Sequence, residues 1–171
     1  YGEKHVKTVE SYNVVAIVFF DLGEYENSLN YHLKALKIKK SLYGETHEST
    51  AHSHYSIGVV HNTLENYRKA KKHHLKALNI RISIYGEVNN FTAASYYQLA
   101  ETYRDLGKHH KALENHLKAL CIKKSFYGEM HLSTANSFFS VGQVYLYLRE
   151  HSKALEHHLK ALQSYRTING E

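Results

Sequence analysis

Histidine is the residue in this sequence best suited to chemistry. The chain has 15 histidines among 171 residues, and adjacent pairs occur at His73-His74, His109-His110 and His157-His158. Imidazole can bind a metal ion or titrate near neutral pH. Four histidines, however, recur every 42 residues: His32, His74, His116 and His158. A metal site needs several ligands converging on one point, so we expect these histidines to pack inside the fold, and we expect no metal site.

The carboxylates and glycines argue against an enzyme. The only aspartates are Asp21 and Asp105, and both precede Leu-Gly at the end of an expected helix. Five of the glutamates occupy one position that is repeated every 42 residues: Glu3, Glu45, Glu87, Glu129 and Glu171. Catalysis requires an asymmetric constellation in one pocket, and all nine glycines are accounted for by turns and helix packing. The sequence therefore predicts a non-enzymatic protein with no cofactor and no small-molecule substrate.

Cysteine use and hydropathy narrow the class further. Cys121 is the single cysteine, which excludes an internal disulfide framework. No stretch approaches the ~20 apolar residues that a membrane span needs. These features favour a cytoplasmic protein without a membrane span.

The organising feature of the chain is a 42-residue repeat. Tyr-Gly-Glu begins at Tyr1, Tyr43, Tyr85 and Tyr127, and His-Leu-Lys-Ala-Leu begins at the four recurrent histidines. The units span residues 1–42, 43–84, 85–126 and 127–168, and a fifth unit starts at residue 169. A fixed period of this length is typical of stacked helical repeats, so we treat residues 1–171 as one domain.

Each repeat carries two helical patterns. In the fourth repeat the expected core stripe of the first helix is Ala135, Phe138, Gly142, Tyr145 and Leu148, and that of the second is Leu155, His158, Leu159 and Leu162. The corresponding first-helix stripe of the first repeat is Val9, Tyr12, Ala16, Phe19 and Leu22. Threonines near the helix starts suggest N-terminal caps (Thr8, Thr50, Thr92 and Thr134). Glycines after the second helices suit left-handed C-terminal caps (Gly44, Gly86, Gly128 and Gly170). Gly58 and Gly142 are expected where helix backbones approach closely.

Small residues at fixed places within each repeat resemble the tetratricopeptide repeat, in the 42-residue form of kinesin light chains and nephrocystin-like proteins. These residues are Ala16, Gly58, Ala100 and Gly142 in the first helices, and Ala35, Ala77, Ala119 and Ala161 in the second. The resemblance covers nearly the whole chain. It implies an all-α solenoid, a right-handed superhelix of four helix-turn-helix repeats, whose first helices line a concave peptide-binding groove. Asparagines that hold a bound peptide in that family are matched only at Asn13, so binding to kinesin-type cargo motifs is not expected to transfer.

One stripe on the first helices varies from repeat to repeat, which suggests a ligand-binding surface. It lies beside the core stripe and is rich in aromatic residues, which are costly on a solvated face. We expect the partner to contact Asn13, Ile17, Phe20, Tyr55, Val59, Tyr97, Gln98, Glu101, Arg104, Phe139, Gln143 and Tyr147. The predicted function is a scaffold that binds a protein or peptide in this groove.

Two other functions fit the same sequence. The chain could be a structural spacer in a larger repeat array, with nothing in the groove. It could also bind RNA or an acidic surface, because its net charge is +6 and Lys34, Lys76, Lys118 and Lys160 form a ladder on the second helices. This reading is less favoured, since solvated lysines on an outer helix face are common. Exposed apolar ends also make weak end-to-end self-association an expectation.

Overall fold

The structure is a computed structural model that describes residues 6–170. Within this range the chain forms eight α-helices and no strand. In chain order they are α1 (Val6–Asp21), α2 (Tyr25–Tyr43), α3 (Glu48–Thr63), α4 (Tyr67–Tyr85), α5 (Asn90–Asp105), α6 (His109–Tyr127), α7 (Leu132–Tyr147) and α8 (His151–Asn169). The first Tyr-Gly-Glu copy and Glu171 lie outside the described residues. The predicted fold class, four all-α helix-turn-helix repeats, is confirmed.

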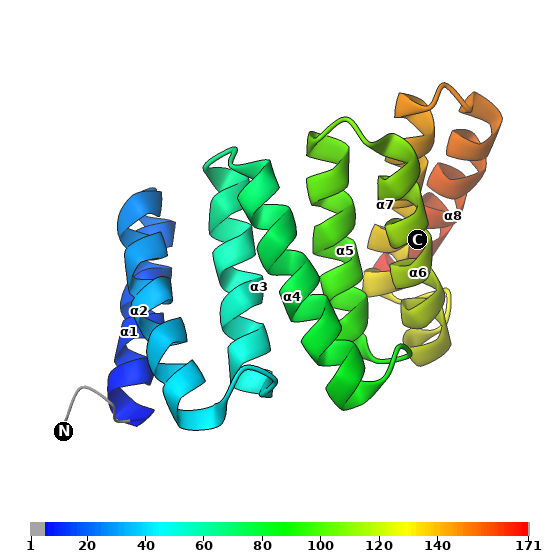
Figure 1. Ribbon diagram of the computed structural model, residues 1–171. Coiled ribbons are helices and arrows are strands. Elements are labelled where there is room, and N and C mark those ends of the chain that lie inside the picture. The colour runs from blue at the N-terminus through cyan, green and yellow to red at the C-terminus, as the bar shows by residue number, and fades with distance from the viewer. Residues whose placement is uncertain (1–5, 171) are drawn as a thin grey trace. The chain divides into compact units, whose positions relative to one another are not determined.

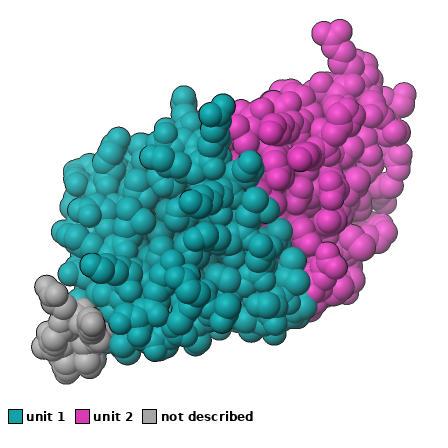
Figure 2. Space-filling model, in the orientation of Figure 1, with its two compact units in different colours: residues 1–86 teal, residues 87–171 magenta. Residues whose placement is uncertain are grey.

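The helices divide into two compact units, residues 1–86 and 87–171 (Figure 2). Unit 1 contains the hairpins α1–α2 and α3–α4, and unit 2 contains α5–α6 and α7–α8 (Figure 1). Inside each unit the second helix of one hairpin packs on the first helix of the next, α2 on α3 and α6 on α7. Each repeat thus buries the apolar face of its neighbour. That all four repeats act as one domain stays a prediction.

The helices α3, α5 and α7 are capped by the residue just before each of them, and not by the predicted threonines. His47, Asn89 and His131 precede α3, α5 and α7, and each side chain accepts a hydrogen bond from the backbone N–H two residues later, at 2.8–3.1 Å. Thr50 already lies inside α3, where its hydroxyl donates to the carbonyl of Gly44 at 2.7 Å. The prediction was wrong for Thr50, Thr92 and Thr134, which come three residues after the caps.

Glycine ends the second helices in a conformation that other residues rarely adopt. Three of these positions have φ of 76–87° with ψ of 177–178°: Gly44, Gly86 and Gly128. This extended, positive-φ region is almost restricted to glycine. The predicted left-handed cap occurs only at Gly170. The turn at Gly44 lets the Tyr43 ring stack on the capping His47 ring, with 4.7 Å between centroids, which links the end of one helix to the start of the next.

The core of unit 2 confirms the predicted first-helix stripe and corrects the second. Its buried cluster is formed by Leu120 from α6, Phe138, Val141 and Tyr145 from α7, and Ala154 and Ala161 from α8. The predicted leucines of α8 are exposed instead, with Leu155 at 61%, Leu159 at 53% and Leu162 at 45%. Leu120, the counterpart of Leu162, is buried under α7, whereas the described residues supply no helix after α8. Leu22, predicted to belong to the core stripe of the first helix, lies in the turn after α1 and is also exposed, at 66%.

Gly58 and Gly142 face the recurrent histidines and not a helix backbone, so the close approach predicted there takes a different form. A Cβ on Gly58 would lie 2.5 Å from Cε1 of His74, which is completely buried. A Cβ on Gly142 would lie 2.9 Å from Cε1 of His158, which is only half-buried and has room to move. Other repeats carry alanine at this position, as at Ala16, so the space depends on how each histidine is held.

Because His74 is held more firmly than His158, the same glycine-to-alanine substitution is expected to change stability differently in the two repeats. Gly58→Ala is expected to lower the free energy of unfolding by about 1–3 kcal/mol, as overpacking of a fixed core does. Gly142→Ala is expected to be close to neutral, because His158 can shift and alanine gains about 1 kcal/mol of helix propensity over glycine. Chemical denaturation of the two variants checks this. Equal destabilisation would show that His158 is held as firmly as His74.

Candidate functional site

The boundary between core and surface on the first helices falls between adjacent residues. His54, Tyr96 and Phe138 are 2–4% exposed. The residues that follow them, Tyr55, Tyr97 and Phe139, are half-buried or exposed, and Phe139 reaches 45%. One residue corresponds to about 100° of rotation around a helix. The variable stripe therefore lies at the surface, next to the core.

The recurrent histidines support the aromatic residues of this stripe. Tyr55 meets His74, Tyr97 meets His116 and Phe139 meets His158, each edge to face, with centroids 5.1–6.0 Å apart. Such T-shaped pairs are a favoured geometry for aromatic rings. The histidines thus have the packing role that their spacing predicted, and they hold one side of each exposed ring.

A pocket of about 180 Å³ opens between α1 and α3, where this pattern is interrupted. The first repeat has Asn13 at the place of Tyr55, and the smaller side chain leaves the space above His32 unfilled. Ile17 and Phe20 of α1 form one wall, and Val59 of α3 contributes to the other. Ile17 is 52% exposed, so the pocket is a mostly apolar hollow open to solvent.

Five of the predicted groove residues line this single pocket: Asn13, Ile17, Phe20, Tyr55 and Val59. The prediction missed four further lining residues, His32, His52, Ser56 and Val60. His32 could have been found from the sequence, because it is the recurrent histidine in the one repeat that lacks a large residue at the position of Asn13. That the pocket binds a partner stays a prediction.

The floor of the pocket is a neutral imidazole with cations beside it. Burial lowers the pKa of His32 to about 4, and the nearby positive charges of His52 and Lys39 add to the effect. Its Nδ1 is buried without a hydrogen-bond partner. Burial also lowers the pKa of Lys39, and the buried Arg81 guanidinium lies 4.7 Å from the centroid of Tyr55. Among the described residues no acidic side chain lines this pocket, so the surroundings favour a neutral or acidic ligand over a cation.

In unit 2 the predicted polar residues of α5 contact one another. Arg104 lies 2.6 Å from Glu101 and 2.9 Å from Asp105. The other Glu101 oxygen lies 3.0 Å from Nε2 of His116. Burial raises the pKa of Glu101, but the neighbouring His116 and Arg104 outweigh it and hold this pKa below its usual range. Glu101 is therefore ionised at neutral pH. Together with Arg104 it forms an ion pair near Tyr97.

The remaining predicted residues of unit 2 connect α5, α6 and α7. Ser140 of α7 donates a hydrogen bond to the Tyr97 hydroxyl at 3.3 Å. Tyr147 stacks on His109 of α6, with centroids 5.0 Å apart and 3° between the ring planes. Gln98 and Gln143 are half-buried. These side chains form a surface of aromatic rings and amides.

Comparison with known proteins identifies the repeat. The family model described as Tetratricopeptide repeat matches residues 7–83 and 91–167. The chain belongs to the tetratricopeptide repeat family. A comparison with curated proteins finds no match.

Several solved structures share this fold at low sequence identity. BtubC (BKLC) from P. vanneervenii has a TM-score of 0.88 and 21% identity, over 95% of this chain and 65% of BtubC. A putative kinesin light chain with nearly identical TPR-like repeats from Podosopora anserina has a TM-score of 0.85 and 15% identity, over 98% of this chain and 79% of that one. A Rap protein complexed with Competence and Sporulation Factor has a TM-score of 0.78 and 21% identity, over 92% of this chain and 42% of the Rap chain.

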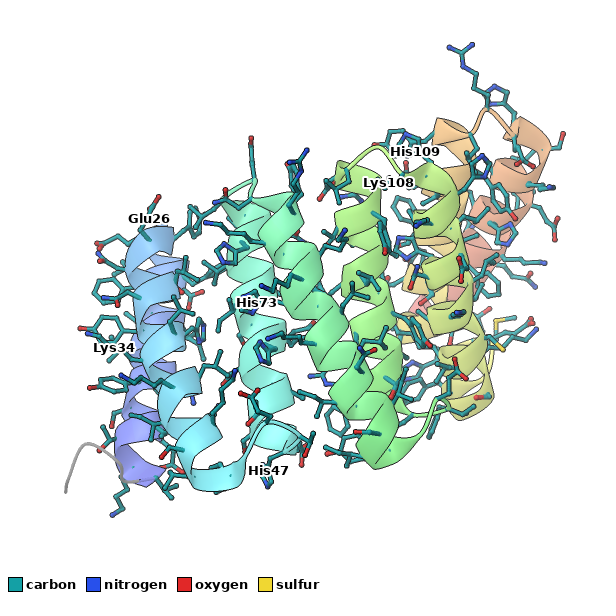
Figure 3. The ribbon with its side chains drawn as sticks, in the orientation of Figure 1. Glu26, Lys34, His47, His73, Lys108 and His109 are labelled. Carbon is teal, nitrogen blue, oxygen red and sulfur yellow. The ribbon has the colours of Figure 1, made fainter. Side chains whose placement is uncertain are left out.

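The second tetratricopeptide repeat contains a histidine cluster that the sequence analysis did not recognise. His73 projects from α4 toward α3 (Figure 3), and its Nδ1 lies 3.0 Å from Nδ1 of His54. The ring of His61 lies on another side of His73, with centroids 5.6 Å apart. Alignment at the 42-residue period would have revealed the cluster, because the first repeat has Tyr12, Phe19 and Tyr31 at these places, in similar ring contacts.

The lysine ladder lies against the tetratricopeptide helices and their acidic residues. Lys118 and Lys160 pair with the glutamates four positions earlier, Glu114 and Glu156, at 3.2 and 2.6 Å. Lys118 also lies 5.3 Å from the centroid of Tyr96, and Lys34 lies 5.0 Å from that of Tyr31. Part of the positive charge is therefore balanced locally, which weakens the case for a nucleic-acid surface.

Among residues 6–170, no three His, Cys, Asp or Glu side chains converge as a group that could hold a metal ion. No helix in this part of the chain has the length and apolar character required to cross a bilayer.

Proposed function

We propose that this tetratricopeptide protein binds a peptide or protein segment along its first helices, and that the pocket between α1 and α3 receives a bulky apolar side chain of that segment. The observation that carries the proposal is the pocket itself. It joins the exposed Ile17 to Tyr55 of the next repeat, over an apolar surface that no described residue covers. Anchoring of one apolar side chain in such a hollow is a common basis of peptide recognition.

The fold and the chemistry of the surface support this function. The tetratricopeptide repeat is typical of protein–protein interaction scaffolds and is generally non-enzymatic, and a Rap protein of the same fold has been solved with Competence and Sporulation Factor. In unit 2, Tyr97, Phe139 and Tyr147 would supply further contact area, and Glu101 with Arg104 would supply polar selectivity. We propose a non-enzymatic, cytoplasmic scaffold that takes no cofactor.

Selection from a random peptide library displayed on phage tests the proposal. Peptides enriched on the chain should carry a large aliphatic or aromatic residue. Ile17→Asp places a charge in the pocket at an exposed helix position, and it should weaken the selected peptides by about 30-fold or more, the effect of losing a hot spot of about 2 kcal/mol. Val14→Asp is the matched control, because Val14 is also an exposed β-branched residue of α1 (60%) but does not line the pocket.

Three outcomes separate the alternatives. Equal binding by Ile17→Asp and Val14→Asp would overturn the pocket as the anchor. Failure to enrich any peptide would favour the structural spacer. Binding of single-stranded RNA that falls by about 10³-fold or more between 50 and 200 mM salt would favour the lysine ladder, since phosphate contacts are strongly salt-dependent. Binding through an apolar anchor should change little over this range.

A further inference from the structure

Three of the four repeats place an aromatic ring at the same site, and the first repeat does not. The ring belongs to Tyr55 in the second repeat, to Tyr97 in the third and to Phe139 in the fourth. The first repeat has Asn13 at this place, and Asn13 lines the pocket between α1 and α3. The contacts of the other rings therefore indicate what this pocket can receive.

The tyrosine of the third repeat, Tyr97, contacts a histidine, a lysine and a serine. Its ring meets His116 edge to face, with centroids 5.2 Å apart, and Nζ of Lys123 lies 5.0 Å from its centroid. Its hydroxyl accepts a hydrogen bond of 3.3 Å from Ser140, which lies on the first helix of the next repeat. A histidine edge, a cation near the ring and a hydroxyl near the phenol together suit a tyrosine side chain.

The same three residue types surround the pocket of unit 1. The residues two periods of 42 before the partners of Tyr97 are His32, Lys39 and Ser56. His32 and Ser56 line the pocket. Lys39 is 6% exposed, and its charge acts on His32 and on His52, which also lines the pocket. The partners of a tyrosine are therefore present here, although the chain itself supplies no ring.

The cation distinguishes a tyrosine from other large apolar residues. Arg81 has the place of Lys39 in the second repeat, and it lies 4.7 Å from the centroid of Tyr55. The fourth repeat has Tyr165 at this place, and its ring is that of Phe139. In this chain a cation thus accompanies a tyrosine. Burial lowers the pKa of Lys39, and no described carboxylate opposes this effect, so the face of a ring would stabilise its ammonium group.

We infer that the pocket between α1 and α3 receives the side chain of a tyrosine from the bound segment. This inference rests on the proposed function and names the residue that the segment inserts. The ring takes the place that Tyr97 has in the third repeat, with its edge against His32, its face toward Lys39 and its hydroxyl hydrogen-bonded to Ser56. The counterpart of the pocket in unit 2 is filled by Tyr97 of α5 and not by an added helix.

Binding of three amino-acid amides tests the inference without a known peptide. The probes are N-acetyl-L-tyrosinamide, N-acetyl-L-phenylalaninamide and N-acetyl-L-leucinamide, and the readout is the NMR shift of the methyl groups of Ile17, which lines the pocket. The tyrosinamide should bind about three-fold or more tighter than either of the others, the effect of one hydrogen bond or one ring–cation contact. Ser56→Ala should equalise the tyrosinamide and the phenylalaninamide. Lys39→Met should weaken both and leave the leucinamide unchanged.

Asn13→Tyr provides a second test, because it supplies the ring from α1. This variant should melt at a higher temperature than the original chain, and its Ile17 methyl groups should no longer respond to the tyrosinamide. Tyrosine has this place in two other repeats, so circular dichroism should show unchanged helicity. Asn13→Ala is the matched control, since it leaves the pocket open and should keep the binding.

Three results would overturn the inference. They are binding of the leucinamide as tight as that of the tyrosinamide, no shift of Ile17 with any of the three amides, and an Asn13→Tyr variant that is destabilised and still binds the tyrosinamide. The proposed function fails separately, if library-selected peptides bind Ile17→Asp and Val14→Asp equally. Selected peptides that lose affinity in Ile17→Asp but insert an aliphatic residue would keep the proposed function and reject the tyrosine.

Discussion

Acidification from pH 7 to pH 4 is expected to destabilise unit 1 by several kcal/mol, with the helices α3 and α4 opening first. The reason is the cluster of His54, His61 and His73, which is packed with neutral imidazoles. Burial, followed by the charges of neighbouring basic residues, lowers the pKa of His54 to about 4 and that of His73 to about 3. The pKa of His61 is lowered by the same two causes. Protonation of any of the three would place a charge beside the other two.

The direction of the effect follows from proton binding. A histidine in the unfolded chain titrates near pH 6.5. Between this pH and the lower pKa of the folded state, the unfolded chain binds more protons, so the free energy of unfolding falls as the pH falls. Each pKa unit corresponds to about 1.4 kcal/mol. For His54, which is 2% exposed, a decrease from 6.5 to about 4 corresponds to roughly 3 kcal/mol.

Most charged groups around the cluster lower the pKa values of its histidines. Lys40 and Lys76 face His54, Lys69 faces His61, and Lys76 and His74 face His73. Glu45 is the one carboxylate that favours protonation, and it acts on His54 alone. His74 adds to the effect, since it is completely buried, and burial together with the charge of Arg81 lowers its pKa to about 4.

Hydrogen exchange measured by mass spectrometry at several pH values can show which unit loses stability on acidification. After correction for the intrinsic rate, α3 and α4 should lose protection below pH 6, while α7 and α8 should lose less, because the fourth repeat has Phe138 and Tyr145 with only His157 at these places. Converting the cluster to the residues of the first repeat, with His54→Tyr, His61→Phe and His73→Tyr, should reduce the difference, and the part that remains should reflect His74.

Two further variants serve as controls for misfolding and for effects unrelated to the cluster. His73→Asn introduces the residue that the third repeat has at this position, Asn115, and removes one titrating group without adding volume. It should reduce the pH dependence in part. His151→Tyr replaces an exposed histidine of α8 and should change nothing. Equal acid sensitivity in the cluster variants and in the original chain would assign the effect to other groups.

The repeat itself was predictable from the sequence because a 42-residue period constrains every helix at once. The four hairpins and the buried first-helix stripe around Phe138 follow from it. Burial on α8 did not follow, because it depends on whether another helix covers the leucines: Leu120 and Leu162 have the same place in the repeat, yet differ from 7% to 45% exposed. Local pattern defines which face is apolar, but the neighbouring helix decides whether that face is buried.

The candidate site was predictable in part for a similar reason. The variable stripe identified Ile17, Phe20 and Tyr55, which the structure brings into one pocket. The caps were misassigned because a threonine near a helix start can either cap the helix or lie within its first turn. The residue at which the helix begins decides between these two roles. The cluster around His73 was missed because the histidines were compared at a single position of the repeat, that of His74. Comparing three positions together shows that only the second repeat has histidine at all of them.

Two adjacent phenylalanines provide the strongest test of where the core ends and the binding surface begins. Phe138→Ala is expected to lower the free energy of unfolding by about 3–5 kcal/mol, as truncation of a buried aromatic residue does. Phe138 is 4% exposed and packs with Leu120, Val141 and Tyr145. Phe139→Ala removes the same atoms from a side chain that is 45% exposed and contacts His158 by one edge. It is expected to cost about 1 kcal/mol or less.

Truncation of the half-buried tyrosines in the same stripe should cost an amount of stability between the losses expected for Phe138→Ala and Phe139→Ala. Tyr55 contacts both His74 and Arg81, and Tyr97 contacts His116 and lies 5.0 Å from Nζ of Lys123. Tyr55→Ala and Tyr97→Ala should therefore destabilise the chain more than Phe139→Ala and less than Phe138→Ala. Denaturant titrations of the four variants, followed by circular dichroism, give this order directly. For Tyr55→Ala, the loss of affinity for library-selected peptides should exceed the loss of stability, because Tyr55 lines the pocket. If Phe139→Ala proved as destabilising as Phe138→Ala, the variable stripe would belong to the core, and the binding surface would have to lie elsewhere.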